Sequence, residues 1–143
     1  MLGLDVSAWG MADFRKLKVW QKAHVLAMDI HEVAGTIRAG DLSSLRSQMI
    51  RAGLSIPTNI VEGCGQSTGR QFIRFLKIAL NSSSELEYHL IVAQRLRAIS
   101  EPGALALKAQ VIEVRKMLHG LIRHITARIE KKRGKRGDET AEE

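Results

Sequence analysis

A proline in the middle of a helical pattern constrains this chain more than any other feature. Pro57 lies in segment 55–63, and apolar residues at helical spacing continue on both sides of it: Met49, Ile50, Ile56, Ile60 and Val61. Proline lacks the amide proton of a helical hydrogen bond, and its ring crowds the carbonyl four residues earlier. Either two helices meet at Pro57 or one helix is kinked there. We expect the kink, because no turn residues flank the proline and Gly63 and Gly65 provide a stop beyond it.

The rest of the sequence favours an all-α fold. Leu, Ile, Ala, Arg and Lys dominate, and aromatic residues make up only 4% of the 143 residues. Apolar spacing predicts four helices, at about residues 14–38, 42–63, 69–100 and 102–132. The expected caps are Asp41 or Ser43 for the second helix, Ser67 or Thr68 for the third, and Ser100 or Glu101 for the fourth. The short connections predict an up-and-down four-helix bundle with a kinked second helix.

This bundle is expected to occupy residues 13–132 as a single domain. Residues 1–12 contain Gly3, Ser7 and Gly10 without a sustained period, so we expect a flexible leader in which Met11 is an alternative start. Residues 133–143 are too charged and too rich in glycine to fold alone, so we expect a disordered tail.

The sequence also predicts a cytoplasmic protein with no membrane segment. No apolar run approaches the ~20 residues that a membrane-spanning helix needs. The first residues lack the basic and apolar blocks of a signal peptide. Cys64 is the only cysteine, which rules out an internal disulfide and a cysteine-based metal cluster.

The positive charge belongs to the predicted bundle. The chain has 22 Lys/Arg and 15 Asp/Glu, of which five and four lie in residues 131–143. The other 130 residues therefore hold 17 and 11, a net charge of +6. This excess favours a polyanionic partner such as RNA or DNA. The alternative is a basic protein whose charge serves solubility alone.

Two helix surfaces concentrate this charge. Three basic residues of the third helix lie on one narrow arc, and four groups of the fourth, including His119, lie within roughly 80° of each other with Lys116 at the edge. The predicted nucleic-acid-binding residues are Arg70, Arg74, Lys77, Lys108, Arg115, Lys116 and Arg123. Few aromatic side chains are available to stack on bases, so binding is expected to be largely independent of sequence. The alternative for both surfaces is a solvated helix face, and the basic block 131–136 either lengthens the footprint or keeps the chain end soluble.

Titratable residues do not form a catalytic or metal site in the sequence. His24 and His31 lie about 10 Å apart along a helix, too far to share an ion. The side chains of His119 and His124, and those of Glu85 and Glu87, point apart around their helices. Cys64 is interpreted as a packing residue, because no histidine lies near it in sequence. We expect no enzyme activity, no metal and no cofactor.

The apolar face of the third predicted helix is broader than one bundle core requires. Its two flanks are separated by more than the ~100° stripe that one core fills. One flank holds Phe75, Leu86, Leu90 and Ala93, and the other holds Ile73, Leu80 and Ile91. Surplus apolar surface is usually covered, so we expect self-association. The alternative is a deeply embedded central helix.

Four segments carry a family resemblance: FRKLKVWQKA (14–23), SIPTNIVEG (55–63), FIRFLKIAL (72–80) and SSELE (83–87). Together they resemble the bacterial four-helix-bundle proteins, also called 23S rRNA intervening-sequence proteins, over about residues 13–130. The resemblance implies an all-helical subunit that assembles as a ring-like homopentamer, with no established enzymatic activity. Asn81 stands where glycine is usual and Cys64 where an aromatic residue is common, so local packing is expected to differ.

The function predicted from these observations is non-catalytic binding of RNA or DNA through phosphate contacts, by an oligomer. A distant branch of the family, the accessory variability determinants of diversity-generating retroelements, partners a reverse transcriptase. An accessory subunit for such a reverse transcriptase is therefore one alternative, and a structural oligomer is another.

Overall fold

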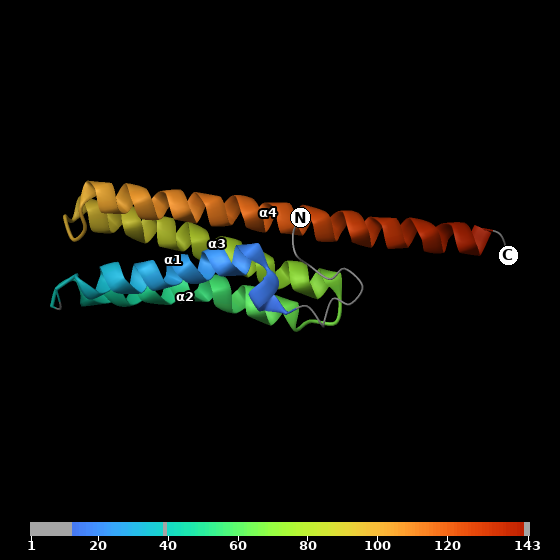
Figure 1. Cartoon of the computed structure of the whole chain (residues 1–143), viewed down its shortest axis with the longest axis horizontal. Coiled ribbons are helices and arrows are strands. Elements are labelled where there is room, and N and C mark those ends of the chain that lie inside the picture. The colour runs from blue at the N-terminus through green and yellow to red at the C-terminus, as the bar shows by residue number, and fades with distance from the viewer. Residues whose placement is uncertain (1–12, 39, 142–143) are drawn as a thin grey trace.

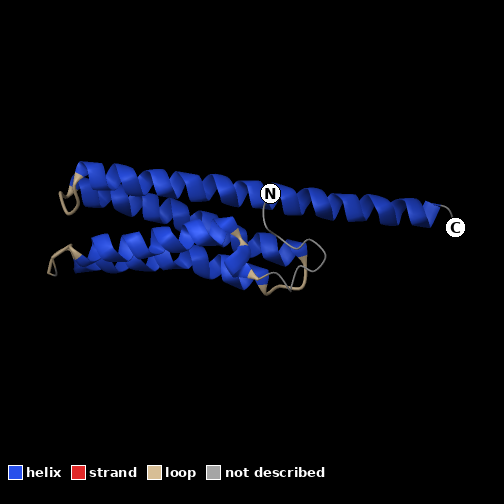
Figure 2. Cartoon of the chain, in the orientation of Figure 1, coloured by secondary structure: helices blue, strands red, loops and turns tan. Residues whose placement is uncertain are grey.

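The structure is a computed structural model that describes residues 13–38 and 40–141. A 3-10 turn, η2 (Phe14–Lys16), precedes four helices: α1 (Lys18–Gly35), α2 (Ser43–Cys64), α3 (Gly69–Arg95) and α4 (Glu101–Ala141). The helices run alternately up and down, each packs against the next, and α1 also packs against α4 (Figure 1). The described residues are helical apart from short connections (Figure 2). The predicted all-α up-and-down bundle is confirmed, and the predicted leader lies outside the described residues.

One apolar core runs along the bundle, and all four helices contribute to it. Apolar residues at the spacing of a helix face inward because every third or fourth side chain lies on the same side. Fully buried members include Leu26, Ile30, Ile56, Ile60, Phe72, Leu76, Leu90, Val111, Leu118 and Ile125.

Helix α2 passes through Pro57 without interruption. The hydroxyl of Thr58 donates to the Leu54 carbonyl (2.7 Å), and the side-chain amide of Asn59 donates to the Ser55 carbonyl (2.8 Å). The Ser55 hydroxyl also bonds that of Ser82 on α3 at 2.7 Å. The single-helix interpretation is therefore confirmed, while the bend at Pro57 stays a prediction.

The first and third helices are shorter than predicted. Leu17 has an extended backbone that separates η2 from α1 and is buried itself, so the first helix begins at Lys18 rather than at residue 14. Helix α3 ends at Arg95 rather than near Ser100, because Arg97 adopts a left-handed φ of 57° and the amide of Ala98 bonds the Ala93 carbonyl at 2.8 Å. Glycine usually holds this left-handed position, so the sequence carried no stop signal.

Two of the predicted helix caps form. The hydroxyl of Thr68 accepts the Gln71 amide (3.2 Å), and that of Ser100 accepts the Gly103 amide (3.1 Å). Helix α2 instead follows Leu42 with no side-chain cap, so the cap expected from Asp41 or Ser43 is not made.

Helix α4 extends well beyond the bundle. Sequence analysis ended it near Lys132, but the structure continues it to Ala141, so residues 133–141 are helical rather than a disordered tail (Figure 1). Every side chain from residue 130 to 141 is exposed. Lys, Arg and Glu favour helix, and this local preference offsets Gly134 and Gly137, which each cost about 1 kcal/mol relative to alanine.

Gly63 sets the distance between α2 and α3. A Cβ atom there would lie 2.9 Å from Phe72 Cδ1 and 3.3 Å from Phe75 Cβ. Gly63→Ala is expected to lower the free energy of unfolding by about 1–2 kcal/mol, because overpacking costs more than the gain in helix propensity. Thermal or urea denaturation measures the change.

Gly120→Ala is the matched control in α4. Its Cβ would meet nothing nearer than Arg123 Nη2 at 3.8 Å. This substitution is expected to raise the free energy of unfolding by about 0.5–1 kcal/mol. Equal effects of the two substitutions would contradict the close approach at Gly63.

Candidate nucleic-acid interface

One end of the bundle gathers segments that lie far apart in the sequence. Because the helices alternate in direction, η2, the end of α2, the start of α3 and the distal part of α4 meet there (Figure 1). Gly69 marks the contact between α3 and α4, since a Cβ on it would lie 3.1 Å from Ile129 Cδ1 and 3.2 Å from Ile125 Cγ2.

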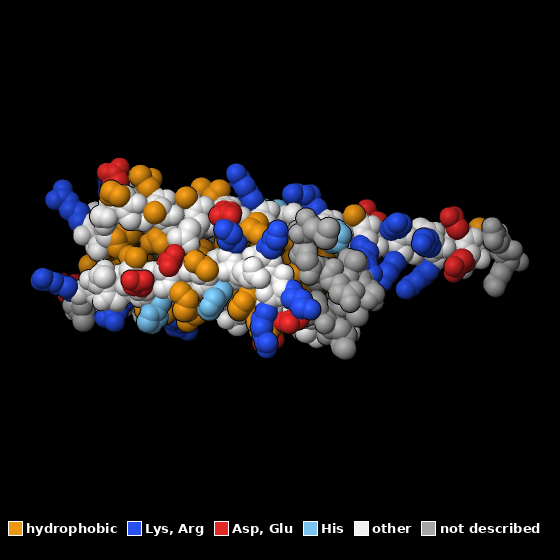
Figure 3. Space-filling model, in the orientation of Figure 1, with side chains coloured by type: hydrophobic (Ala, Val, Ile, Leu, Met, Phe, Trp, Pro, Cys, Tyr) orange, Lys and Arg blue, Asp and Glu red, His pale blue; other side chains and the backbone are white. Residues whose placement is uncertain are grey.

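This end, with the adjoining extension of α4, is strongly basic. We call it the basic end and define it by Arg15, Lys16, Lys18, Arg70, Arg74, Arg123, Arg128, Lys131, Lys132, Arg133, Lys135 and Arg136. Among the described residues, the acidic groups nearby are Asp13, Glu62 and Glu130, before Asp138 and Glu139 at the tip of the extension. On the face that Figure 3 shows, Lys and Arg side chains lie along the protruding part of α4 together with a few acidic ones, whereas hydrophobic side chains lie along its bundle part. The net charge of the chain is therefore unevenly distributed.

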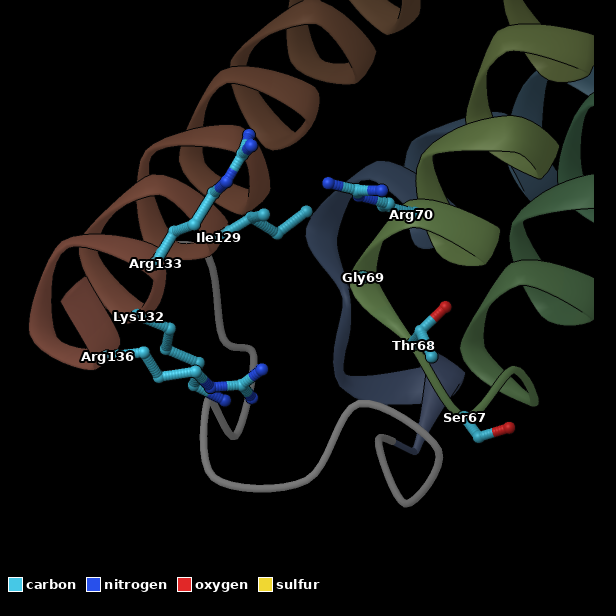
Figure 4. Close-up of a pocket in the computed structure, with 8 residues that line it drawn as sticks. All are labelled: Ser67, Thr68, Gly69, Arg70, Ile129, Lys132, Arg133 and Arg136. Carbon is cyan, nitrogen blue, oxygen red and sulfur yellow. The ribbon is translucent and has the colours of Figure 1, made fainter. Parts of the chain in front are cut away.

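A cavity of about 510 Å³ lies within the basic end, between the start of α3 and α4. Arg70 extends from α3 toward α4, and Lys132, Arg133 and Arg136 approach from α4 (Figure 4). The remaining lining residues are Ser67, Thr68, Gly69 and Ile129, so none of the described lining residues is acidic. Cationic side chains from two helices thus share this cavity with the apolar side chain of Ile129.

The structure divides the predicted binding residues into two groups. Arg70, Arg74, Lys77, Lys116 and Arg123 are exposed and available to a partner. The other two, Lys108 and Arg115, are half-buried between α3 and α4.

Arg115 and Lys108 bind α3 instead of pointing to solvent. Arg115 donates from Nη2 to Glu87 Oε2 at 2.5 Å and from Nε to Ser83 Oγ at 3.4 Å. Lys108 Nζ donates to Gln94 Oε1 at 3.3 Å. Angular position on a single helix could not reveal these partners, because they belong to the neighbouring helix. Both residues are therefore better explained as contacts that join α3 to α4.

Sequence reasoning undervalued the block 131–136. It left open whether this block lengthens the binding surface or only keeps the chain end soluble. In the structure the block is helical and brings Arg133 and Arg136 to the same cavity as Arg70. The alternation of helix direction was a usable signal, because it places the end of the fourth helix beside the start of the third.

Cys64 is a buried packing residue at this end of the bundle. Burial raises the pKa of its thiol from 9.0 to about 11, and the carboxylate of Asp13 adds to the effect. The thiol is neutral at ordinary pH and a poor nucleophile. Within residues 13–38 and 40–141, no group of three His, Cys, Asp or Glu side chains is arranged to hold a metal ion. In the same part of the chain, no helix is long and apolar enough to span a membrane.

Comparison with known proteins gives the family. The model of the 23S rRNA-intervening sequence protein family matches residues 15–120. The chain belongs to this family. The chain is similar to the crystal structure of a protein with unknown function from the S23 ribosomal protein family of Bacteroides thetaiotaomicron, with 27% identity and a TM-score of 0.69. The match covers 73% of this chain and 97% of that one. No protein with a curated description is significantly similar to the chain.

The range that matches the family excludes many residues of the basic end. Residues 121–143 lie outside the matched range, and they include Arg123, Arg133 and Arg136. By contrast, Arg70, Arg74 and Lys77 lie within it. The cavity is thus built from one arginine of the family region and basic residues beyond that region.

The raised pKa of Cys64 predicts slow modification of the folded protein. At pH 8 the thiol is protonated in the folded state, so a thiol reagent is expected to label it slowly, and unfolding in urea to make labelling fast. As pH rises from 9 toward 11, the unfolded thiol loses its proton before the folded one. The free energy of unfolding should therefore fall in this interval, and less so in Cys64→Ala. Fast labelling of the folded protein at pH 8 would contradict the burial.

Proposed function

We propose that the protein binds RNA or DNA non-catalytically, through phosphate contacts made by its basic end. The observation that carries the proposal is the convergence of basic residues from η2, α3 and α4 at one end of the bundle, with few acidic residues among them. Lysine and arginine neutralise phosphates and release condensed counterions, so such a surface attracts any nucleic acid. The family description refers to an intervening sequence of 23S rRNA, which is compatible with a nucleic-acid partner. It identifies no residue that contacts one.

The extension of α4 enlarges this surface. Residues 130–141 are exposed on all sides, and their basic part can approach a phosphate backbone without steric hindrance from the bundle. Base stacking contributes little to the proposal, because the half-buried Phe14 and Trp20 pack against each other, with ring centroids 5.0 Å apart. Binding is therefore expected to be electrostatic and largely independent of base sequence.

Salt titration is the primary test. Binding of single- and double-stranded RNA and DNA, measured by fluorescence anisotropy, is expected to weaken steeply as salt increases, with a log–log slope of about −0.9 per phosphate contact on a duplex. Absence of binding at low salt, or affinity that ignores salt, would contradict the proposal.

Charge reversal localises the contacts. Arg74→Glu with Arg123→Glu is expected to weaken binding at least about tenfold and to reduce the salt slope by about 2, because two phosphate contacts become repulsive. Both side chains are exposed, so circular dichroism and melting temperature should change little. Arg51→Glu with Arg95→Glu is the control, since it changes net charge by the same amount at two exposed arginines outside the basic end. An equal loss in the control would mean that net charge alone matters.

We also propose that the protein self-associates, and that a second copy of the chain covers the apolar side chains exposed on the bundle surface. Leu105 (57% exposed) and Ile112 (42%) lie two turns apart on the outer surface of α4, and Val25 and Met28 are exposed on α1. On α3, the predicted flank residue Ile91 is 47% exposed, whereas Leu86, Leu90 and Ala93 are buried in the core. Several copies would present several basic ends to one polymer and raise avidity.

Light scattering tests the assembly. A mass that is a multiple of the 15.9 kDa monomer is expected, about five-fold for the pentamer that the family resemblance implies. Leu105→Glu with Ile112→Glu is expected to shift the mass toward the monomer, because charges would be buried in the interface. A monomeric mass for the unmodified protein at micromolar concentration would contradict self-association.

A further inference from the structure

The cavity between the start of α3 and α4 has a charge pattern that packing alone does not explain. Three guanidinium groups line it, from Arg70 on one side and from Arg133 and Arg136 on the other (Figure 4). Among the described residues, none of the three forms an ion pair with a carboxylate. The side chain of Arg133 reaches toward that of Arg70, whereas Arg136 extends toward the other side of the cavity (Figure 4). Like charges that face each other repel, and an anion between Arg70 and Arg133 would remove this repulsion.

The position of Arg70 adds to the unfavourable electrostatics. It is the second residue of α3, a helix of 27 residues with no acidic residue in its first turn. Negative charge is favoured at a helix start and positive charge is disfavoured there, because the helix dipole has its positive end at that terminus. The chain thus holds a cation where the helix itself would favour an anion.

The two walls of the cavity are held together by packing beneath it. Gly69 lacks a side chain, and Ile125 and Ile129 of α4 fill the space that a Cβ would need. Ile125 is fully buried, so this contact belongs to the core of the bundle. This packing fixes the separation of α3 and α4 at Ile125 and Ile129, and Arg133 lies one turn beyond Ile129 on the same helix. Arg70 and Arg133 are therefore brought to facing sides of one cavity, which favours a defined ligand over a diffuse ion cloud.

We propose that this cavity binds the terminal phosphate of a nucleic-acid strand, with Arg70 and Arg133 as its ligands. The inference rests on the proposed function and assigns a distinct role to one part of the basic end. A terminal monoester carries a charge of about −1.5 to −2 and three acceptor oxygens, whereas an internal diester carries a single charge. Guanidinium groups bind phosphate oxygens in bidentate fashion, so two of them on facing helices match the doubly charged terminal phosphate better than an internal one.

The size and floor of the cavity agree with a strand end rather than a bare ion. Its volume of about 510 Å³ falls within the ~300–1,000 Å³ range of pockets that hold small organic ligands. Ile129 provides an apolar contact for the sugar or base that follows the phosphate.

The experiment compares one short single-stranded oligonucleotide in three forms, with a 5′-phosphate, with a 3′-phosphate and with hydroxyls at both ends. Fluorescence anisotropy with an internal label measures their affinities. A terminal phosphate is expected to tighten binding about tenfold, because its additional negative charge strengthens the charged hydrogen bonds that the arginines donate. Arg70→Gln with Arg133→Gln should abolish this preference, so that all three forms bind equally and more weakly than the hydroxyl form binds the unmodified protein. Arg51→Gln with Arg95→Gln removes the same charge outside the basic end and should keep the preference.

The outcomes separate this inference from the proposed function. Salt-dependent binding that is equal for all three forms would overturn the terminal-phosphate site and leave the proposed function intact. A preference that survives in Arg70→Gln with Arg133→Gln would also overturn it. Adenosine monophosphate that binds as tightly as the phosphorylated strand would replace the strand end with a free nucleotide. Absence of binding by every form would overturn both proposals.

Discussion

Two glycines, which lack side chains, let neighbouring helices approach closely at the end of the bundle that carries the basic residues. This close packing holds that end together. Gly63 lets α2 approach Phe72 of α3, and Gly69 lets α3 approach Ile125 and Ile129 of α4. Gly63 lies just before the short connection between α2 and α3, and Gly69 lies just after it. Three helices are therefore brought together within a few residues of chain, and the charged side chains above these contacts inherit their spacing from them.

The up-and-down topology determines which charges become neighbours. Residues at the start of α1, the start of α3 and the distal part of α4 share one end because each helix reverses the direction of the last. The connections between α1 and α2 and between α3 and α4 lie at the opposite end, and the second of them contains the left-handed Arg97. A modest excess of basic residues thus becomes a concentrated positive surface, and long-range attraction of a polyanion depends on that concentration more than on net charge.

The sequence was sufficient to predict the four helices and their order, because apolar residues recur at helical spacing throughout the chain. It was insufficient where one residue departed from its usual role or where the partner lay on another helix. Arg97 takes a backbone conformation that normally belongs to glycine, so the end of α3 was misplaced. Arg115 looked like part of a basic surface until Glu87 and Ser83 of α3 were found beside it. The composition of residues 133–141 suggested disorder, although the same lysines and arginines are good helix formers.

The protruding part of α4 differs in kind from the rest of that helix. Residues 130–141 bury no side chain, so their helicity depends on local propensity, and an unsupported helix of this length is only marginally stable in water. Repulsion between Lys132 and Arg136, four residues apart, weakens it further. A polyanion that neutralises these charges would therefore strengthen the helix itself, so that the arm and its ligand would order each other. At 1.5 Å per residue, such an arm reaches about 18 Å past the bundle, which makes its rigidity a determinant of how far along a strand one subunit can act.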